Sequence, residues 1–249
     1  MDEPLLLVEH ISIRFGGLLA VDQASLAVRR GYITALIGPN GAGKTTLFSL
    51  IAGFLKPSGG RVFFDGADIT REPAHRRARR GMARTFQLVQ PFAGLTVHEN
   101  IAVGSHLRWR ARRDALMAAE NVAREVGLYN LLGRSAAALT IAERKRLELA
   151  RALATQPRLM LLDEVLAGLN PSEIRDIIPV IRSICDRGVS ILMTEHVMQA
   201  VMSLSKHVFV LAQGRVIAQG PPAAVVADPL VVEAYLGRGA AVLPNQADP

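Results

Sequence analysis

The segment at residues 38–45 constrains the fold of this chain more than any other feature of its sequence. It reads Gly-Pro-Asn-Gly-Ala-Gly-Lys-Thr and fits the P-loop pattern G-x-x-x-x-G-K-[ST]. An apolar run at residues 32–37 predicts a strand before it, and residues 44–54 predict a helix after it. A glycine-rich turn that merely precedes a helix would not require the lysine and the threonine. The strand, loop and helix together therefore predict a nucleotide-binding α/β fold.

The chemistry of the P-loop assigns roles to its residues. Glycines let successive backbone N–H groups curve around phosphate, and the helix N-terminus adds a partial positive charge. Lys44 is expected to contact the outer phosphates, and the Thr45 hydroxyl is expected to ligate Mg²⁺. The residues predicted to bind ATP here are Gly38, Pro39, Asn40, Gly41, Ala42, Gly43, Lys44, Thr45 and Thr46.

Two later apolar runs end in polar residues. Residues 159–162 lead to Asp163 and Glu164, and residues 189–193 are followed by Thr194, Glu195 and His196. Ligands of open parallel sheets lie at the carboxyl ends of the strands, so Asp163 is expected to hold Mg²⁺. Glu164 is placed to polarise a water against the γ-phosphate, the alternative being a solvent-exposed carboxylate. His196 is expected at the same edge in contact with the γ-phosphate, the alternative being a structural histidine.

The remaining pattern alternates strands with helices, which predicts a mostly parallel sheet covered on both faces. Residues 96–132 are rich in Ala, Leu, Arg and Glu and predict an inserted helical subdomain. The predicted strands are residues 5–13, 26–28, 32–37, 61–64, 159–162 and 189–193, with a hairpin at 208–218; the other predicted helices are residues 171–187, 197–204, 222–226 and 229–236.

The expected fold class is α/β: a P-loop ATPase core with a mostly parallel sheet, an N-terminal antiparallel β portion and an inserted helical subdomain. The whole chain, residues 1–249, is expected to form one domain. The ATP-binding core would comprise residues 1–87 and 156–236, the helical subdomain residues 88–155 and a C-terminal tail residues 237–249.

The charge of the chain is +7, from 29 Lys and Arg against 22 Asp and Glu, and arginines cluster within residues 71–84 and 108–113. Such runs predict solvated faces, with a nucleic acid or an anionic membrane surface as alternatives. The first run lacks interleaved aromatic residues that could stack on bases, so no nucleic-acid partner is expected. A single cysteine, Cys185, and an acidic N-terminus indicate a cytoplasmic chain. No apolar stretch approaches the roughly 18–20 residues of a membrane-spanning helix.

The order and spacing of these motifs resemble the ATP-binding subunits of ABC transporters over almost the whole chain. The resemblance identifies residues 38–45 with the Walker A motif, Asp163 and Glu164 with the Walker B aspartate and the catalytic glutamate, and His196 with the switch histidine. It also implies that Phe15 stacks on adenine. Gln87, in Arg84-Thr85-Phe86-Gln87, would sense Mg²⁺ and the coupled membrane subunit and take part in catalysis.

Four further segments resemble the branched-chain amino acid importer branch of that family: residues 14–21, 83–87, 167–171 and 233–237. This resemblance implies two ATPase subunits that close over two ATP molecules and drive two transmembrane permease subunits. The permeases would receive solute from a periplasmic or extracellular binding protein. The chain would then lie peripherally on the cytoplasmic face of the cell membrane, with the helical subdomain and the region after Gln87 facing the permeases.

One segment departs from the family pattern. The family completes each ATP site with the partner's signature motif, Leu-Ser-Gly-Gly-Gln, and the matching residues here are Leu139, Thr140, Ile141, Ala142 and Glu143. Both glycines are missing, and Glu143 brings a negative charge that should repel phosphate. Thr140-x-x-Glu143 also fits a capping box for the following helix. We therefore hypothesise a heterodimer with one strong and one weaker ATP site, a homodimer being the alternative.

Other functions remain open or are disfavoured. The same ATPase could serve urea or amide import or lipopolysaccharide export, because solute choice lies in other subunits. A soluble ABC protein of DNA repair or translation would need a tandem ATPase domain or a long coiled-coil insertion, and 249 residues accommodate neither. A small-molecule kinase is disfavoured by the positions of Glu164 and His196 and by the signature-like helix.

Overall fold

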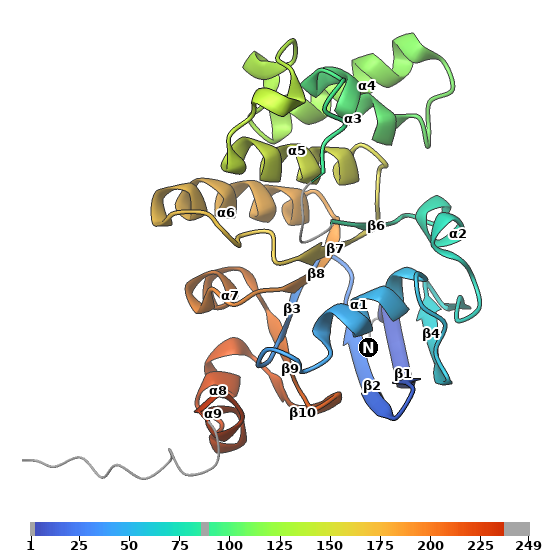
Figure 1. The fold of residues 1–249 in the computed structure, drawn as a ribbon, viewed down its shortest axis with the longest axis vertical. Helices are drawn as coiled ribbons and strands as arrows, with labels where there is room; N and C mark the ends of the chain where they lie inside the picture. Colours follow the sequence, from blue (N-terminus) through green and yellow to red (C-terminus); the bar gives the residue numbers. More distant parts are fainter. Residues whose placement is uncertain (1–2, 86–89, 237–249) are drawn as a thin grey trace, which may run out of the picture.

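The computed structural model describes residues 3–85 and 90–236, and within them the chain forms two β-sheets flanked by helices (Figure 1). The first sheet is antiparallel, in the order β2-β1-β4-β5. Its strands are β1 (Leu6–Phe15), β2 (Leu18–Val28), β4 (Gly59–Phe64) and β5 (Ala67–Asp68). A bulge in β1 between Val8 and Ile11 keeps Ile11 and Ile13 on the buried face with Leu6 and Val8. This sheet confirms the predicted N-terminal antiparallel portion.

The second sheet has the order β10-β9-β3-β8-β7-β6 and supplies the strand ends on which the polar motifs lie. Five of its strands are parallel and β10 pairs antiparallel at one edge. The strands are β3 (Ile33–Ile37), β6 (Met82–Arg84), β7 (Leu159–Asp163), β8 (Ser190–Thr194), β9 (His207–Ala212) and β10 (Arg215–Gly220). The central strands β3, β7 and β8 are buried at every position, which explains their continuous apolar runs.

The two faces of this sheet belong to different cores. On one face Leu36, Leu161 and Leu192 pack with the antiparallel sheet and with α1 (Lys44–Ala52). On the other face Ala35 and Met193 pack with α5 (Ile141–Leu153), α6 (Pro171–Asp186) and α7 (Met198–Leu204). The parallel sheet is therefore covered on both sides, as predicted.

A helical unit lies beyond α5, at the top of Figure 1. It consists of α3 (Val97–Ser105), α4 (Arg112–Glu125) and two short 3₁₀ turns, Tyr129–Leu131 and Ala136–Ala138. Thr96 and Glu99 form a capping box at the start of α3. The remaining helices are α2 (Ala74–Arg79), α8 (Pro222–Val226) and α9 (Pro229–Leu236). None of the helices in the described part of the chain has the length and apolarity to cross a bilayer.

The predicted elements differ from the structure mainly at their ends. The strand predicted at residues 26–28 is only the end of the longer β2, and α1 ends at Ala52 because Gly53 adopts a left-handed conformation. The helical stretch predicted from residue 96 is two helices separated by residues 106–111. The short elements β5, α2 and β6 were not predicted, because two to six residues carry too little periodic pattern.

The prediction that the first arginine run forms a solvated face is wrong for Arg77. Its side chain is buried, and its guanidinium donates to the backbone carbonyl oxygens of Leu50 and Ile51, in the last turn of α1, and of Thr70 and Glu72. The last carbonyls of a helix have no partner within the helix, so a buried arginine can satisfy them. Burial lowers the pKa of Arg77 to about 10.

Candidate active site

The P-loop joins β3 to α1, and its backbone is pressed against the neighbouring strands. A Cβ atom on Gly38 would lie 2.0 Å from the Leu211 carbonyl oxygen, and one on Gly43 would lie 2.5 Å from the Ala20 carbonyl oxygen. Both residues also have positive φ angles, 152° and 101°. Gly43 is the N-cap of α1 and brings no capping side chain, so the first N–H groups of the helix face the loop. The loop therefore offers backbone donors to an anion.

Lys44 lies beneath this loop and is buried. Its Nζ atom donates to the carbonyl oxygens of Gly38, at 2.7 Å, and Pro39, at 3.0 Å. Burial lowers the pKa of Lys44, while the nearby carboxylates of Glu164 and Asp163 raise it. The ammonium group thus holds the P-loop through two backbone carbonyls, within the electrostatic field of the carboxylates at the end of β7.

Asp163 is held in a buried polar layer where β7 and β8 end. It pairs in register with Thr194, whose Oγ1 donates to Asp163 Oδ1 at 2.8 Å. The Asp163 N–H donates to Thr85 Oγ1 at 3.0 Å. The carboxylate is therefore oriented by the last residue of β8, and the Asp163 backbone is held by the residue that follows β6.

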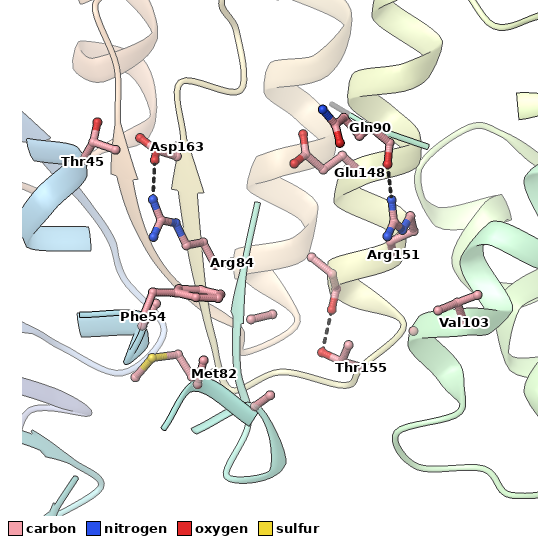
Figure 2. A pocket seen from close by; sticks show the side chains of 16 residues that line it. Thr45, Phe54, Met82, Arg84, Gln90, Val103, Glu148, Arg151, Thr155 and Asp163 are labelled. Atoms are coloured by element: carbon pink, nitrogen blue, oxygen red, sulfur yellow. Dashed lines mark hydrogen bonds and ion pairs between the residues drawn. The ribbon is translucent and has the colours of Figure 1, made fainter. Parts of the chain in front are cut away.

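Arg84, the last residue of β6, completes the surroundings of Asp163 (Figure 2). Its Nη2 donates to Asp163 Oδ2 at 2.9 Å and its Nη1 to Ser49 Oγ at 3.0 Å. The side chains of Arg84 and Asp163 are 8% and 3% exposed. Sequence reasoning placed Arg84 in the solvated run and missed this contact, so that prediction is wrong for Arg84 as well. The sequence did contain a signal for a buried Arg84, because this charged residue directly follows the apolar residues Met82 and Ala83.

Glu164 and His196 form a second pair at the same edge. Glu164 has a φ of 48°, and its N–H donates to the carbonyl oxygen of Thr194 at 3.1 Å, which turns the chain sharply after β7. His196 Nε2 lies 2.9 Å from Glu164 Oε1. The Glu164 side chain is 15% exposed and that of His196 is 40% exposed, so water can reach the pair. The structure brings together the two residues expected at this edge.

Thr45 and Asp163 both line one groove, of about 790 Å³, that opens beside the P-loop (Figure 2). We refer to it as the Asp163 groove. Hydroxyl and carboxylate oxygens are the hard ligands that Mg²⁺ takes together with phosphate oxygens and water. The residues present therefore fit Mg²⁺.

The far wall of the Asp163 groove comes from the helical unit. Val103 of α3 and Glu148 and Arg151 of α5 point into it from the side opposite Asp163 (Figure 2). Arg151 donates to the Gln90 carbonyl oxygen at 3.1 Å, and its guanidinium lies 4.5 Å from the centre of the Phe92 ring. Burial lowers the pKa of Arg151. The groove thus connects the Asp163 carboxylate with α3 and α5.

Phe15, a predicted contact of the nucleotide, lies on the N-terminal hairpin. Phe15 is the last residue of β1 and is 47% exposed, on the hairpin whose second strand carries Ala20 against the P-loop. This position leaves the ring free to stack on a base. Gln87 lies outside the described residues.

The signature-like segment lies at the start of α5, on the opposite face of the parallel sheet from α1 (Figure 1). The predicted capping box is confirmed: the Glu143 N–H donates to Thr140 Oγ1 at 3.2 Å, and the Thr140 N–H donates to Glu143 Oε2 at 2.7 Å. Arg134 lies 3.4 Å from Glu143 Oε1, so the carboxylate is partly neutralised within the chain. Leu139 is buried, Ala142 is half-buried and Ile141 is 59% exposed. The structure does not bring this segment into the chain's own P-loop site.

Two family models and two curated relatives that match this chain describe ATP-binding proteins of ABC transporters. Residues 21–167 match the family model described as ABC transporter, and residues 215–241 match that of the branched-chain amino acid ATP-binding cassette transporter. The chain is 40% identical to the high-affinity branched-chain amino acid transport ATP-binding protein BraF of Pseudomonas aeruginosa, over 96% of the chain and 100% of that protein. It is 38% identical, with the same coverage, to the corresponding Escherichia coli protein, LivG.

Solved structures agree with this. A nucleotide-free ATP-binding cassette from an ABC transporter superposes with a TM-score of 0.87 at 32% identity, covering 94% of this chain and 100% of that one. The ADP conformation of an ATP-binding cassette gives a TM-score of 0.86 at 33% identity, covering 95% and 100%. The fold class predicted from the sequence is confirmed by these neighbours.

Proposed function

Because the chain belongs to the family of ABC transporter ATP-binding proteins, we propose that it hydrolyses ATP to power uptake of a branched-chain amino acid or a related small solute. The family assignment confirms the resemblance drawn from the motifs. The solute is inferred from the names of BraF and LivG and from the match at residues 215–241. The observation that carries the hydrolytic function is the Glu164–His196 pair beside the P-loop.

Each residue of the site has a proposed role in binding or hydrolysing ATP. The P-loop N–H groups and Lys44 bind the phosphates, and Phe15 stacks on the adenine. Glu164, held by His196, accepts a proton from the attacking water, and His196 also contacts the γ-phosphate. Mg²⁺, when bound, neutralises charge on the phosphates, with Thr45, Asp163 and Gln87 as its protein-derived ligands.

The partners follow from the surfaces that remain. One of two transmembrane permease subunits would dock on the side of the Asp163 groove formed by the helical unit, at Val103, Glu148 and Arg151. The chain would then divide into an ATP-binding core, residues 1–87 and 156–236, and a helical subdomain, residues 88–155, with residues 237–249 as a tail. It would lie peripherally on the cytoplasmic face of the membrane, and a periplasmic or extracellular solute-binding protein would deliver the solute.

A second ATPase subunit completes the proposed assembly. Residues Leu139–Glu143 would act on the ATP bound by that subunit, because they lie away from the P-loop of their own chain. The capping box uses the Glu143 N–H, and the missing glycines restrict approach to phosphate. We therefore propose a heterodimer in which the partner subunit supplies the stronger signature.

The function is tested with purified protein, Mg²⁺ and ATP, by comparing the wild type with Glu164→Gln. The variant should bind a fluorescent ATP analogue like the wild type, while hydrolysis falls by about 10²- to 10⁴-fold, the usual effect of a general base. Glu120→Gln, on the exposed face of α4, should hydrolyse ATP normally. Near-normal turnover of Glu164→Gln would remove Glu164 from the mechanism, and failure of the wild type to bind ATP would refute the proposed function.

A further inference from the structure

The Arg84 guanidinium stands at the Asp163 carboxylate, where a cation would be bound. We propose that Arg84 is a positioning residue that competes with Mg²⁺ for Asp163, and so sets the Mg²⁺ concentration that the ATP site requires. The inference rests on the proposed function, because it needs Mg²⁺ and ATP at this site.

The contact is close and shielded from water. Arg84 Nη2 lies 2.9 Å from Asp163 Oδ2, and both side chains are less than a tenth exposed. The other carboxylate oxygen of Asp163, Oδ1, accepts from Thr194 Oγ1. Both oxygens of Asp163 are therefore already engaged. A metal ion that binds Asp163 must share an oxygen with one of these donors or displace it.

Arg84 is also hydrogen-bonded to α1, the helix that carries Thr45, the other expected metal ligand. Its Nη1 donates to Ser49 Oγ on α1, and Ser49 Oγ donates to the backbone carbonyl oxygen of Thr45. The Phe54 ring, with its centre 5.7 Å from Arg84 Cζ, covers the guanidinium from one side. These contacts hold the guanidinium in place. The Arg84 charge therefore cannot move away to reduce its repulsion of a bound Mg²⁺.

Electrostatics gives the direction of the effect. Two cations that share one carboxylate repel each other, and the repulsion is strong at a site with little water to screen it. Arg84 therefore lowers the affinity for Mg²⁺, while it stabilises the buried Asp163 carboxylate when no metal ion is bound. A residue that merely oriented Asp163 for the metal ion would have the opposite effect, because its loss would weaken Mg²⁺ binding.

The test is a Mg²⁺ titration of the binding of N-methylanthraniloyl-ATP, starting from protein in EDTA. In Arg84→Gln, the Mg²⁺ concentration that gives half of the affinity gain should fall by about fivefold or more, because the repulsive charge is gone. Arg84→Lys keeps a positive charge and should stay within about twofold of the wild type. Arg80→Gln, which breaks an exposed pair with Glu72, is the matched control and should not change the titration.

Thermal unfolding in EDTA shows whether each variant is folded. Should Arg84→Gln fail to fold, Arg84→Met removes the charge while its unbranched stem keeps packing against Phe54, and the same shift is expected. An unchanged or higher Mg²⁺ requirement in the folded, charge-free variant would overturn the proposal. If Mg²⁺ has no effect on nucleotide binding by the wild type, the proposed function itself fails, and the two failures are therefore distinct.

Discussion

His196 Nε2 lies 2.9 Å from Glu164 Oε1, across the ends of the neighbouring parallel strands β8 and β7. The contact can fix the orientation of the Glu164 carboxylate through Oε1 and leave Oε2 to accept a hydrogen bond from a water molecule. Glu164 directly follows β7, and His196 lies two residues after the end of β8, so the sheet itself fixes the distance between the two side chains.

His196→Ala should lower the rate of ATP hydrolysis by about 10²-fold or more, because the Glu164 base loses its orientation. Binding of ATP to the P-loop should change little. Steady-state hydrolysis and analogue binding measure both quantities, with His75→Ala on the exposed face of α2 as the control. A hydrolysis rate within twofold of the wild type would show that the contact has no catalytic consequence.

Lys44→Ala should weaken ATP binding itself by about tenfold or more, because it deletes a buried charge that contacts phosphate before the reaction begins. Fluorescence titration with an ATP analogue measures the affinity. The exposed Lys56, in the turn after α1, provides the matched control Lys56→Ala. Equal affinities of the two variants would contradict the role of Lys44.

The mass of Glu164→Gln in solution tests whether the second ATPase subunit is another copy of this chain or a different protein. Slow hydrolysis should trap any closed dimer, so light scattering with and without Mg²⁺ and ATP reports whether this chain pairs with itself. We expect the variant to bind ATP and remain a monomer, because residues 139–143 form a weak signature. An ATP-dependent doubling of the mass would overturn the heterodimer.

Glu195 makes the stability of the fold depend on pH. Burial raises its pKa to about 7 from a usual value of 4.5. The folded chain then holds this proton more tightly than the unfolded chain, so the free energy of unfolding falls between pH 4.5 and pH 7 and levels off above. The loss should be on the order of 3 kcal/mol.

Glu195→Gln cannot ionise and keeps an oxygen for the Leu166 N–H. Urea unfolding at pH 5 and pH 8 should show the variant gaining stability relative to the wild type as pH rises. The exposed variant Glu120→Gln should show no such change. A stability difference between wild type and Glu195→Gln that is the same at both pH values would refute the prediction.

Glu143 contributes to stability through the capping box. Glu143→Ala should lower the free energy of unfolding by about 1 kcal/mol, whereas Glu143→Gln keeps the box and should cost less. Urea unfolding distinguishes the two variants. Equal losses would mean that the Arg134 ion pair, and not the cap, provides the stabilisation.

The sequence predicted those parts of the site in which a local pattern determines position. The P-loop, the carboxylates at the end of β7 and the capping box at Thr140 each depend on residues close together in the chain. The Arg84–Asp163 pair could not be predicted in this way, since its partners are 79 residues apart. Arg77 was misjudged for the same reason: its exposure depends on the end of α1, more than twenty residues earlier.

The P-loop is supported by residues from both ends of the chain. Gly38 packs against the Leu211 carbonyl, Gly43 against the Ala20 carbonyl, and the Gly214 N–H donates to the Ala42 carbonyl oxygen. β3, which leads into the loop, pairs with β8 and β9, both synthesised more than 150 residues later. A nascent chain that has emerged only as far as α1 therefore lacks the neighbours that shape this loop. The ability to hold nucleotide is acquired late in synthesis, when the β9–β10 hairpin has left the ribosome.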